Sequence, residues 1–192
     1  LNNTGALCIH TGKFTGRSPK DKFIVQDAIT TDTVHWNEFN NPIDEKYFHI
    51  LYKKMMDFLG TKEEIWVRDS YVCADKNYRL NIRVVNENAW SNLFAYNLFL
   101  RPTDEELESF EPDWHIIQAP SFFANPETDG VRSSNFAVVS FTHKMILIGG
   151  TGYTGEMKKG IFTVLNYLLP QQKHVLSMHC CCLLYTSPSP RD

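Results

Sequence analysis

The feature that most constrains this chain is a glycine-rich stretch, GGTGYTGEMKKG, at residues 149–160. An apolar run from Met145 to Ile148 precedes it, and a second apolar run from Ile161 to Leu169 follows it. This order is typical of a strand, a tight turn and a helix. Glycines before a helix allow positive φ angles and a close approach of the backbone to a ligand, and the first free N–H groups of a helix attract anions. The stretch therefore predicts an anion site at the start of a helix.

Two lysines, Lys158 and Lys159, stand in or near the first turn of this expected helix. The helix dipole disfavours cations at that end, whereas Glu156 suits it, so the lysines need a compensating partner such as a bound anion. Neighbouring helix residues point about 100° apart, so the two lysines are expected to serve different partners. A helix start with two solvated lysines is the alternative, and the spacing alone leaves both interpretations open.

The composition is that of a globular, mildly acidic protein. The 192 residues are 43% hydrophobic and 21% charged, with a net charge of -3, so the chain can bury a core but lacks the basic excess of a general nucleic-acid binder. No apolar run has the length of a membrane span, and no signal peptide is evident at the start. Three of the five cysteines are contiguous and none forms a CxxC pair, which fits a reducing cytosol. We expect a cytoplasmic protein with no nucleic-acid or membrane partner.

A second polar stretch, TGKFTGRSPKDKF at residues 11–23, gathers positive charge. Gly12, Gly16 and Pro19 mark it as a turn-rich loop. Its cations are Lys13, Arg17, Lys20 and Lys22. Arg17 stands between a glycine and a Ser-Pro pair, where its guanidinium could fork onto a carboxylate or a phosphate. A solvated basic hairpin loop is the alternative.

Periodicity predicts alternating strands and helices along the rest of the chain. Apolar and β-branched patterns predict strands at residues 7–9, 23–25, 65–73, 80–85, 114–119, 136–141 and 145–148. The strands 65–73 and 80–85 should form a hairpin, with Arg83 solvated or paired. Helical spacing predicts helices at 44–59, at 86–100 and, after a Thr103–Glu106 capping box, at 103–110. The apolar stripe expected on the second helix consists of Ala89, Trp90, Leu93, Phe94 and Asn97.

Loops are expected at residues 28–39, anchored by Trp36 and Phe39, and at residues 125–135. The helix that follows the glycine-rich stretch should run over residues 156–169, lie buried and end at Pro170. A last strand over residues 174–180 would place His179 at its end. A lone histidine is more often structural, unless it converges with another polar group.

Five segments together resemble the ATP-dependent phosphoenolpyruvate carboxykinases. They are TGRSPKDK at 15–22, RVVNENAW at 83–90, GGTGYTGEMKKG at 149–160, NYLLP at 166–170 and SMHC at 177–180. The resemblance implies an α/β fold: the mixed-sheet N-terminal domain of a two-domain enzyme, truncated at both ends and spanning residues 1–181, with the site in the cleft between the domains. It also implies conversion of oxaloacetate and ATP to phosphoenolpyruvate, ADP and carbon dioxide in gluconeogenesis.

The resemblance assigns roles by position. Arg17 matches the family arginine that holds a carboxylate of oxaloacetate or phosphoenolpyruvate, and Tyr153 matches the tyrosine that contacts the same substrate. Lys159 and His179 match the ligands of the catalytic Mn²⁺ and also belong to the ATP site, which implies Mn²⁺ together with Mg²⁺ bound to ATP. Lys159 is in addition a catalytic and substrate-binding residue by this resemblance. Lys158 would lend its charge to the phosphoryl group in transfer.

The chain departs from the family pattern at Gly152 and at its end. Gly152 stands where the pattern GGTWYGGE has an aromatic residue. After SMHC, the family continues into a GKT-type phosphate loop, an aspartate as third metal ligand and the adenine site, none of which follows in this sequence. Residues 182–192, CLLYTSPSPRD, resemble the conceptual translation of a transposase sequencing adapter, and a disordered natural tail is the alternative.

We therefore expect an incomplete carboxykinase that lacks the C-terminal nucleotide-binding domain and is inactive by itself. A non-catalytic module is the main alternative, in which Arg17 and Lys158 hold a phosphate or carboxylate metabolite. The absence of a G-x-x-x-x-G-K-[ST] motif counts against a complete small nucleotide-dependent enzyme.

Overall fold

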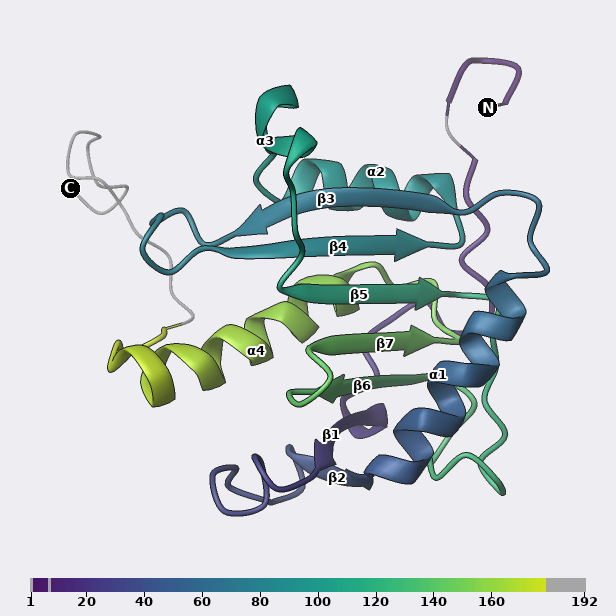
Figure 1. Cartoon of the computed structure of the whole chain (residues 1–192). Coiled ribbons are helices and arrows are strands. Elements are labelled where there is room, and N and C mark those ends of the chain that lie inside the picture. Colours follow the sequence, from purple (N-terminus) through teal and green to yellow (C-terminus); the bar gives the residue numbers. More distant parts are fainter. Residues whose placement is uncertain (1, 7, 179–192) are drawn as a thin grey trace, which may run out of the picture.

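One mixed sheet organises the chain. The computed structural model describes residues 2–6 and 8–178, within which seven strands form a single sheet (Figure 1). Six of them lie where the sequence predicts strands: β1 (Lys22–Gln26), β3 (Trp66–Val72), β4 (Leu80–Asn86), β5 (Trp114–Ala119), β6 (Phe136–Ser140) and β7 (Met145–Gly149). No sequence pattern predicts β2 (Asn41–Asp44), because Ile43 is its only buried residue and its Pro42 suits only an edge strand.

The strands follow the order β2-β1-β6-β7-β5-β4-β3. Neighbours are parallel except in the antiparallel pairs β6–β7 and β3–β4, so the predicted hairpin and the mixed sheet are confirmed. Strands β4, β5 and β7 point the same way, and their carboxyl ends meet at one edge. There Asn86 lies beside Gln118, and Ala119 lies beside Gly149. The glycine-rich loop leaves the sheet from this edge (Figure 1).

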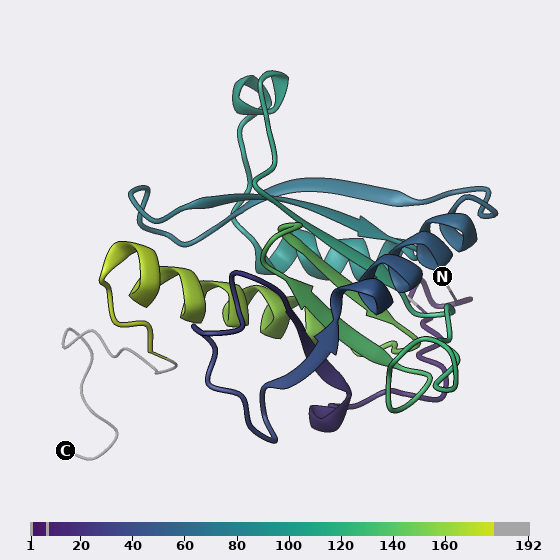
Figure 2. The ribbon, with the colours of Figure 1, turned by 60° about the horizontal axis from the view of Figure 1, so that its bottom comes forward.

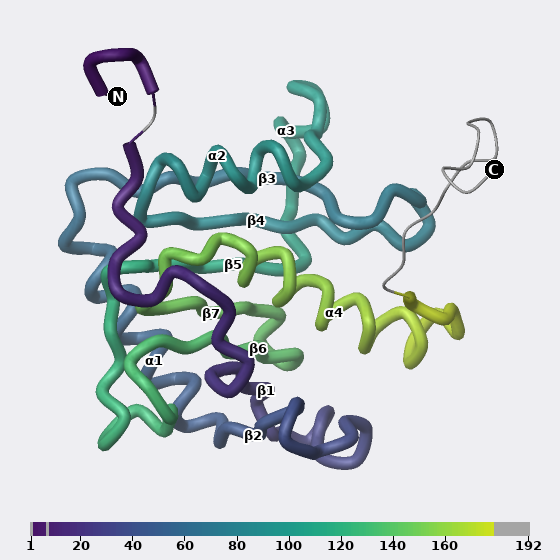
Figure 3. The backbone as a smooth tube through the Cα atoms, turned by 180° about the vertical axis from the view of Figure 1, so that it is seen from behind, coloured from purple at the N-terminus to yellow at the C-terminus, as the bar shows by residue number. Residues whose placement is uncertain are grey.

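Helices cover both faces of the sheet, which explains why the central strands are continuously apolar. The helix α1 (Glu45–Leu59) packs on one face, and α2 (Ala89–Leu98) and α4 (Gly155–Lys173) pack on the other (Figures 1 and 3). Neighbouring side chains of one strand therefore pack into the cores on opposite faces of the sheet. Ile116 packs with the residues of α2 and α4, and Ile117 packs with those of α1. No helix within the described part of the chain is both long and apolar enough to cross a membrane.

Local caps fix the ends of the predicted helices. The Asp44 side chain accepts a hydrogen bond from the N–H of Lys46 at the start of α1, and Gly60 caps its end. The predicted capping box of Thr103 and Glu106 begins α3 (Asp104–Glu108), which has no buried residue and stands away from the sheet (Figure 2). Arg83 is paired, as expected: its Nε and Nη2 donate to the two carboxylate oxygens of Asp69 at 2.7 and 2.8 Å, which raises the pKa of the guanidinium.

Two helix predictions were wrong in part. Helix α2 begins at Ala89, not Asn86, and its buried residues are Ser91, Asn92 and Ala95, not the predicted stripe, of which Leu93 is 48% exposed. The second error concerns α4, which continues past Pro170 to Lys173 and has no buried residue after Val164. The last turns project beyond the sheet, so the proline there removes one backbone donor without disturbing a core.

Three smaller expectations also failed. Cys8 and Ile9 are not in a strand, and neither are residues 174–178, because His174 caps α4 in the left-handed conformation with φ 55°. Phe39 does not anchor its loop, since it is 75% exposed, whereas Trp36 packs against the core and its indole N–H donates to the carbonyl of Thr31. The rest of the expected strand at residues 174–180, with His179, lies outside the described residues.

A buried carboxylate organises the loop between β5 and β6. Asp129 is 1% exposed and accepts hydrogen bonds from the Lys54 ammonium, from the Asn125 N–H at 2.9 Å and from the Thr128 hydroxyl at 2.7 Å. Burial works to raise the pKa of Asp129, but these hydrogen bonds outweigh it, so the pKa lies below its ordinary value.

We expect Asp129→Asn to lower the free energy of unfolding by about 2–4 kcal/mol at neutral pH, because it leaves Lys54 without its charged partner. Since folding lowers this pKa, the stabilisation is present above the unfolded value of 3.8 and is lost as the pH falls through the lower folded value. Urea unfolding should therefore show a gap between the two proteins that closes below about pH 4. Asp57→Asn, which breaks the exposed pair with Lys53, should change stability by less than about 1 kcal/mol. Equal effects of the two substitutions would contradict this account.

Candidate functional site

The glycine-rich loop joins β7 to α4, as predicted. Gly150 has φ 68°, and a Cβ atom there would lie 2.7 Å from the carbonyl oxygen of Ser134. Its N–H donates to the carbonyl of Ala119 at the end of β5. The loop thus needs a glycine here both for its backbone conformation and for its close approach to the neighbouring chain.

The basic loop, residues 11–22, lies directly against the glycine-rich loop. The N–H of Gly152 donates to the carbonyl of Phe14 at 2.9 Å, and the Thr151 hydroxyl donates to the same oxygen at 3.2 Å. A Cβ atom on Gly152 would lie 2.3 Å from the carbonyl oxygen of Thr11. The structure therefore brings together the two segments that the sequence analysis identified separately, and Gly152 makes their contact possible.

The predicted substrate residues occupy the two sides of this contact. Arg17 lies on the basic loop and its side chain is exposed. Tyr153 is half-buried, and its ring lies over the beginning of α4, where a Cβ atom on Gly155 would meet it at 2.4 Å. The two residues thus lie on the two loops that the Gly152–Phe14 hydrogen bond joins.

The buried acid of the motif has a partner that the sequence analysis did not predict. Glu156 is 4% exposed and pairs with Lys22, whose Nζ lies 3.0 Å from Glu156 Oε2. The other carboxylate oxygen, Oε1, is buried and has no hydrogen-bond partner in the described structure. Lys22 therefore forms an ion pair at the start of α4, and its charge is not available to an anion bound at the basic loop.

The two lysines of the motif lie in different surroundings, as their helical spacing predicts. Lys158 is exposed, whereas Lys159 is half-buried and lines a cavity of about 60 Å³ together with Lys22 and Glu156. Within residues 8–178, neither Lys158 nor Lys159 forms an ion pair, and Arg17 forms none. Three cations at this edge of the sheet are thus available to an anion.

A buried polar network under the loop was missed. The Asn86 amide donates to Gln118 Oε1 at 3.1 Å and to the sulfur of Met157 at 3.4 Å, and it accepts a hydrogen bond from Asn92. Arg68 in turn donates to Asn92 at 2.9 Å. These bonds tie the ends of β4 and β5 to the first turn of α4. The segment RVVNENAW contains one member of the network, Asn86, and only the fold brings Gln118 and Met157 to it.

A second support holds the basic loop. Arg132, in the loop before β6, lies 2.8 Å from Asp21, whose carboxylate is buried just after Arg17 at the 3₁₀ helix Pro19–Asp21. No sequence signal predicts this role for Arg132, since residues 125–135 carry no pattern beyond that of a surface loop.

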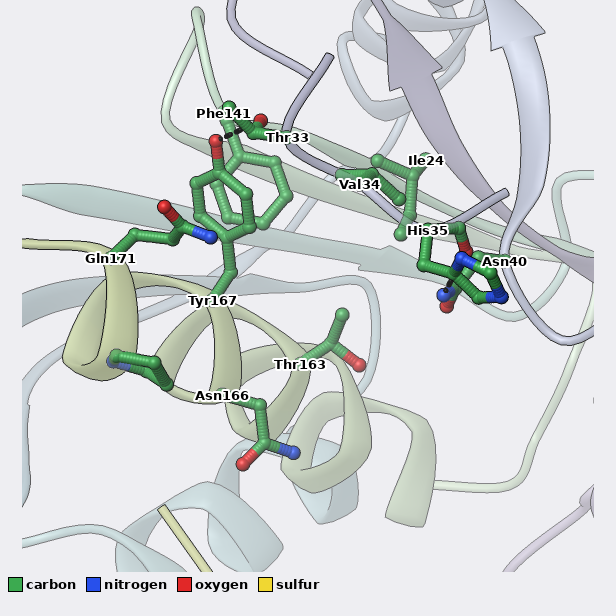
Figure 4. A pocket seen from close by; sticks show the side chains of 11 residues that line it. Ile24, Thr33, Val34, His35, Asn40, Phe141, Thr163, Asn166, Tyr167 and Gln171 are labelled. Atoms are coloured by element: carbon green, nitrogen blue, oxygen red, sulfur yellow. Dashed lines mark hydrogen bonds between the residues drawn. The ribbon is translucent and has the colours of Figure 1, made fainter. Parts of the chain in front are cut away.

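A cavity beside the later turns of α4 is separate from the paired loops. About 290 Å³ in volume, it lies between the later turns of α4 and the loop after β1, and the Thr33 and Tyr167 hydroxyls meet across it at 2.6 Å (Figure 4). No lysine or arginine lines it, so it lacks the charge that an anion site needs. His179 lies outside the described residues, and its expected convergence with Lys159 stays a prediction.

The chain is similar to phosphoenolpyruvate carboxykinases over nearly its whole length. The family model of phosphoenolpyruvate carboxykinase matches residues 1–187. Relatives named phosphoenolpyruvate carboxykinase (ATP) are 61% identical over 178 residues in Flavobacterium johnsoniae, 56% over 179 in Christiangramia forsetii and 52% over 180 in Bacillus cereus. These matches cover 93–94% of this chain and 33–34% of each relative. The chain thus spans about a third of the length of these relatives.

We expect Gly152→Ala to separate the two loops, because the added methyl group would displace the backbone of Thr11. The free energy of unfolding should fall by about 1–3 kcal/mol, and trypsin should cleave after Arg17 faster than in the unchanged protein. Gly16→Ala is the matched control, since nothing lies within 4 Å of its added Cβ atom. If Gly152→Ala behaves like Gly16→Ala in both assays, the contact does not hold the basic loop.

Proposed function

Because the chain belongs to the ATP-dependent phosphoenolpyruvate carboxykinase family, we propose that the paired loops form the substrate side of a carboxykinase site. The reaction would convert oxaloacetate and ATP to phosphoenolpyruvate, ADP and carbon dioxide, as a step of gluconeogenesis in the cytoplasm. The observation that carries this proposal is the hydrogen bond from Gly152 to Phe14, which holds the loop of Arg17 against the loop of Tyr153, directly before the helix turns that contain Lys158 and Lys159.

Each side chain has a role that suits its position. The exposed guanidinium of Arg17 would hold a substrate carboxylate through two parallel hydrogen bonds. Tyr153, over the start of α4, would contact the same substrate and exclude water from one side of it. Lys158, exposed and without an ion pair within the described residues, would place its charge on the phosphoryl group in transfer.

In the reaction, the bond between the departing carboxylate and the rest of oxaloacetate breaks and carbon dioxide leaves. The electron pair of that bond forms an enolate, whose oxygen then takes the γ-phosphoryl group of ATP. Negative charge therefore develops and moves at one end of the substrate while the other carboxylate stays fixed. One cation on the basic loop and two at the start of α4 suit this chemistry, because they would hold one anionic end and stabilise the other.

Among the described residues, Lys159 and Glu156 suit the divalent cation that the family implies. Lys159 lines the same small cavity as Glu156, whose buried Oε1 atom has no hydrogen-bond partner in the described structure. The Nζ atom of Lys159 and the imidazole of His179 would hold Mn²⁺, with Mg²⁺ entering as its complex with ATP. When bound there, Mn²⁺ would supply positive charge beside the oxygen that becomes the enolate. The nucleotide would be held mainly by a C-terminal domain. The relatives are about three times as long as the matched segment, which is long enough for such a domain.

The first test is the binding of phosphoenolpyruvate, measured by calorimetry. We expect Arg17→Ala to weaken binding about 10- to 100-fold, because a charge-assisted hydrogen-bonding pair contributes about 1.5–3 kcal/mol. Arg17→Lys should restore only part of the affinity, since an ammonium cannot fork onto the carboxylate. Lys20→Ala removes an exposed positive charge from the same loop and should change affinity less than about threefold. Equal losses in Arg17→Ala and Lys20→Ala would contradict a specific site.

The second test is turnover in a chimaera. Residues 1–178 of this chain would replace the matching segment of the Flavobacterium johnsoniae relative, with which the chain is 61% identical. We expect ATP-dependent carboxykinase activity within about tenfold of the parent, and a loss of at least about 100-fold on Lys158→Ala. A folded chimaera that binds phosphoenolpyruvate without turnover would favour a non-catalytic anion-binding module.

A further inference from the structure

Three metal-binding side chains converge far from the glycine-rich loop. Glu45 and His49 lie one turn apart at the start of α1, and His143 lies in the turn that joins β6 to β7. One ligand atom from each residue falls within 4.8 Å of the others. The glycine-rich loop follows the other end of β7, so this cluster is separate from the proposed carboxykinase site and contains none of its residues.

Both imidazoles direct a nitrogen at the same carboxylate oxygen. His143 Nε2 lies 2.9 Å and His49 Nε2 lies 3.9 Å from Glu45 Oε1. The two imidazole rings are 4.8 Å apart and nearly perpendicular. In a tetrahedral zinc site, ligand atoms at the usual bond lengths lie about 3.3 Å from one another. The two nitrogen–oxygen distances lie on either side of this value, and no two of the three ligand atoms are more than 4.8 Å apart, so side-chain rotations would complete the geometry.

The surroundings hold His143 in place. Its ring stacks on Phe48 with a centroid distance of 4.9 Å and an interplanar angle of 9°, and Phe48 is itself only 2% exposed. The backbone N–H of His143 donates to the Ser140 hydroxyl. The hydroxyl of the preceding residue, Thr142, donates to the Asp27 carboxylate at 2.7 Å. The ligand from the turn is thus oriented by a buried aromatic ring and a fixed backbone, as a binding site requires.

We propose that Glu45, His49 and His143 form a Zn²⁺ site that clamps the start of α1 to the β6–β7 turn. Two imidazole nitrogens and one carboxylate oxygen are a ligand set that zinc favours. The three side chains remain 42%, 56% and 31% exposed, so the fourth position faces solvent and would hold water. Because the ligands come from two separate elements, zinc binds the folded chain better than the unfolded one and stabilises it.

The test is thermal unfolding of the metal-free protein with added zinc sulfate. At about 100 times the dissociation constant, zinc should raise the unfolding midpoint by about 5–10 °C. His49→Ala should abolish this shift without threatening the fold, because His49 is exposed. His143→Phe should also abolish it, while keeping a ring against Phe48. The matched control, His35→Ala, removes an exposed histidine outside the cluster and should keep the full shift.

Co²⁺ provides an independent readout of the same ligands. The protein should show the visible absorption bands of four-coordinate Co²⁺, and these should be lost in His49→Ala and retained in Lys159→Ala, whose lysine belongs to the proposed carboxykinase site. The proposal is overturned if micromolar zinc leaves the unfolding midpoint unchanged. It is equally overturned if the shift survives both His49→Ala and His143→Phe.

Discussion

The hydrogen bond between the Gly152 N–H and the Phe14 carbonyl joins the two halves of the candidate site. The basic loop precedes the sheet and the glycine-rich loop leaves it, so without this contact Arg17 and Tyr153 would belong to unrelated segments. The contact needs residue 152 to have no side chain, because the backbone of Thr11 fills the space of a Cβ atom. Gly152 stands where an aromatic residue is expected. In this chain, the glycine leaves the space that the backbone of the basic loop occupies.

Charge is distributed over this edge with a clear division of roles. Lys22 neutralises the buried Glu156, and Arg132 neutralises the buried Asp21, so each buried carboxylate at the base of the loops has its own cation. Within the described residues, Arg17, Lys158 and Lys159 form no such pairs. A chain with a net charge of -3 can therefore attract an anion at one place, because a local group of cations unpaired within the described chain outweighs the weak overall repulsion.

The sequence predicted those parts of the site that local patterns encode. The strand, turn and helix around Gly150 follow from residue types whose conformational limits act within a few residues, and so do six of the seven strands. The network of Asn86, Gln118 and Met157 could not be predicted, since its members meet only when β4, β5 and α4 pack together. For the same reason, the buried face of α2 contains Ser91 and Asn92, where hydrophobic periodicity favours Leu93.

Proline and histidine show the same limit. Local sequence rules predict that a helix ends at Pro170. Helix α4 nevertheless continues past it, because the last turns lie beyond the sheet. His143 carries no signal in sequence, since Glu45 and His49 reach it only through the fold. The single most direct test of the joined loops is amide hydrogen exchange with and without phosphoenolpyruvate. The account predicts that residues 11–17 and residues 150–156 gain protection together, at the same ligand concentration. Protection of only one loop, or of neither, would contradict it.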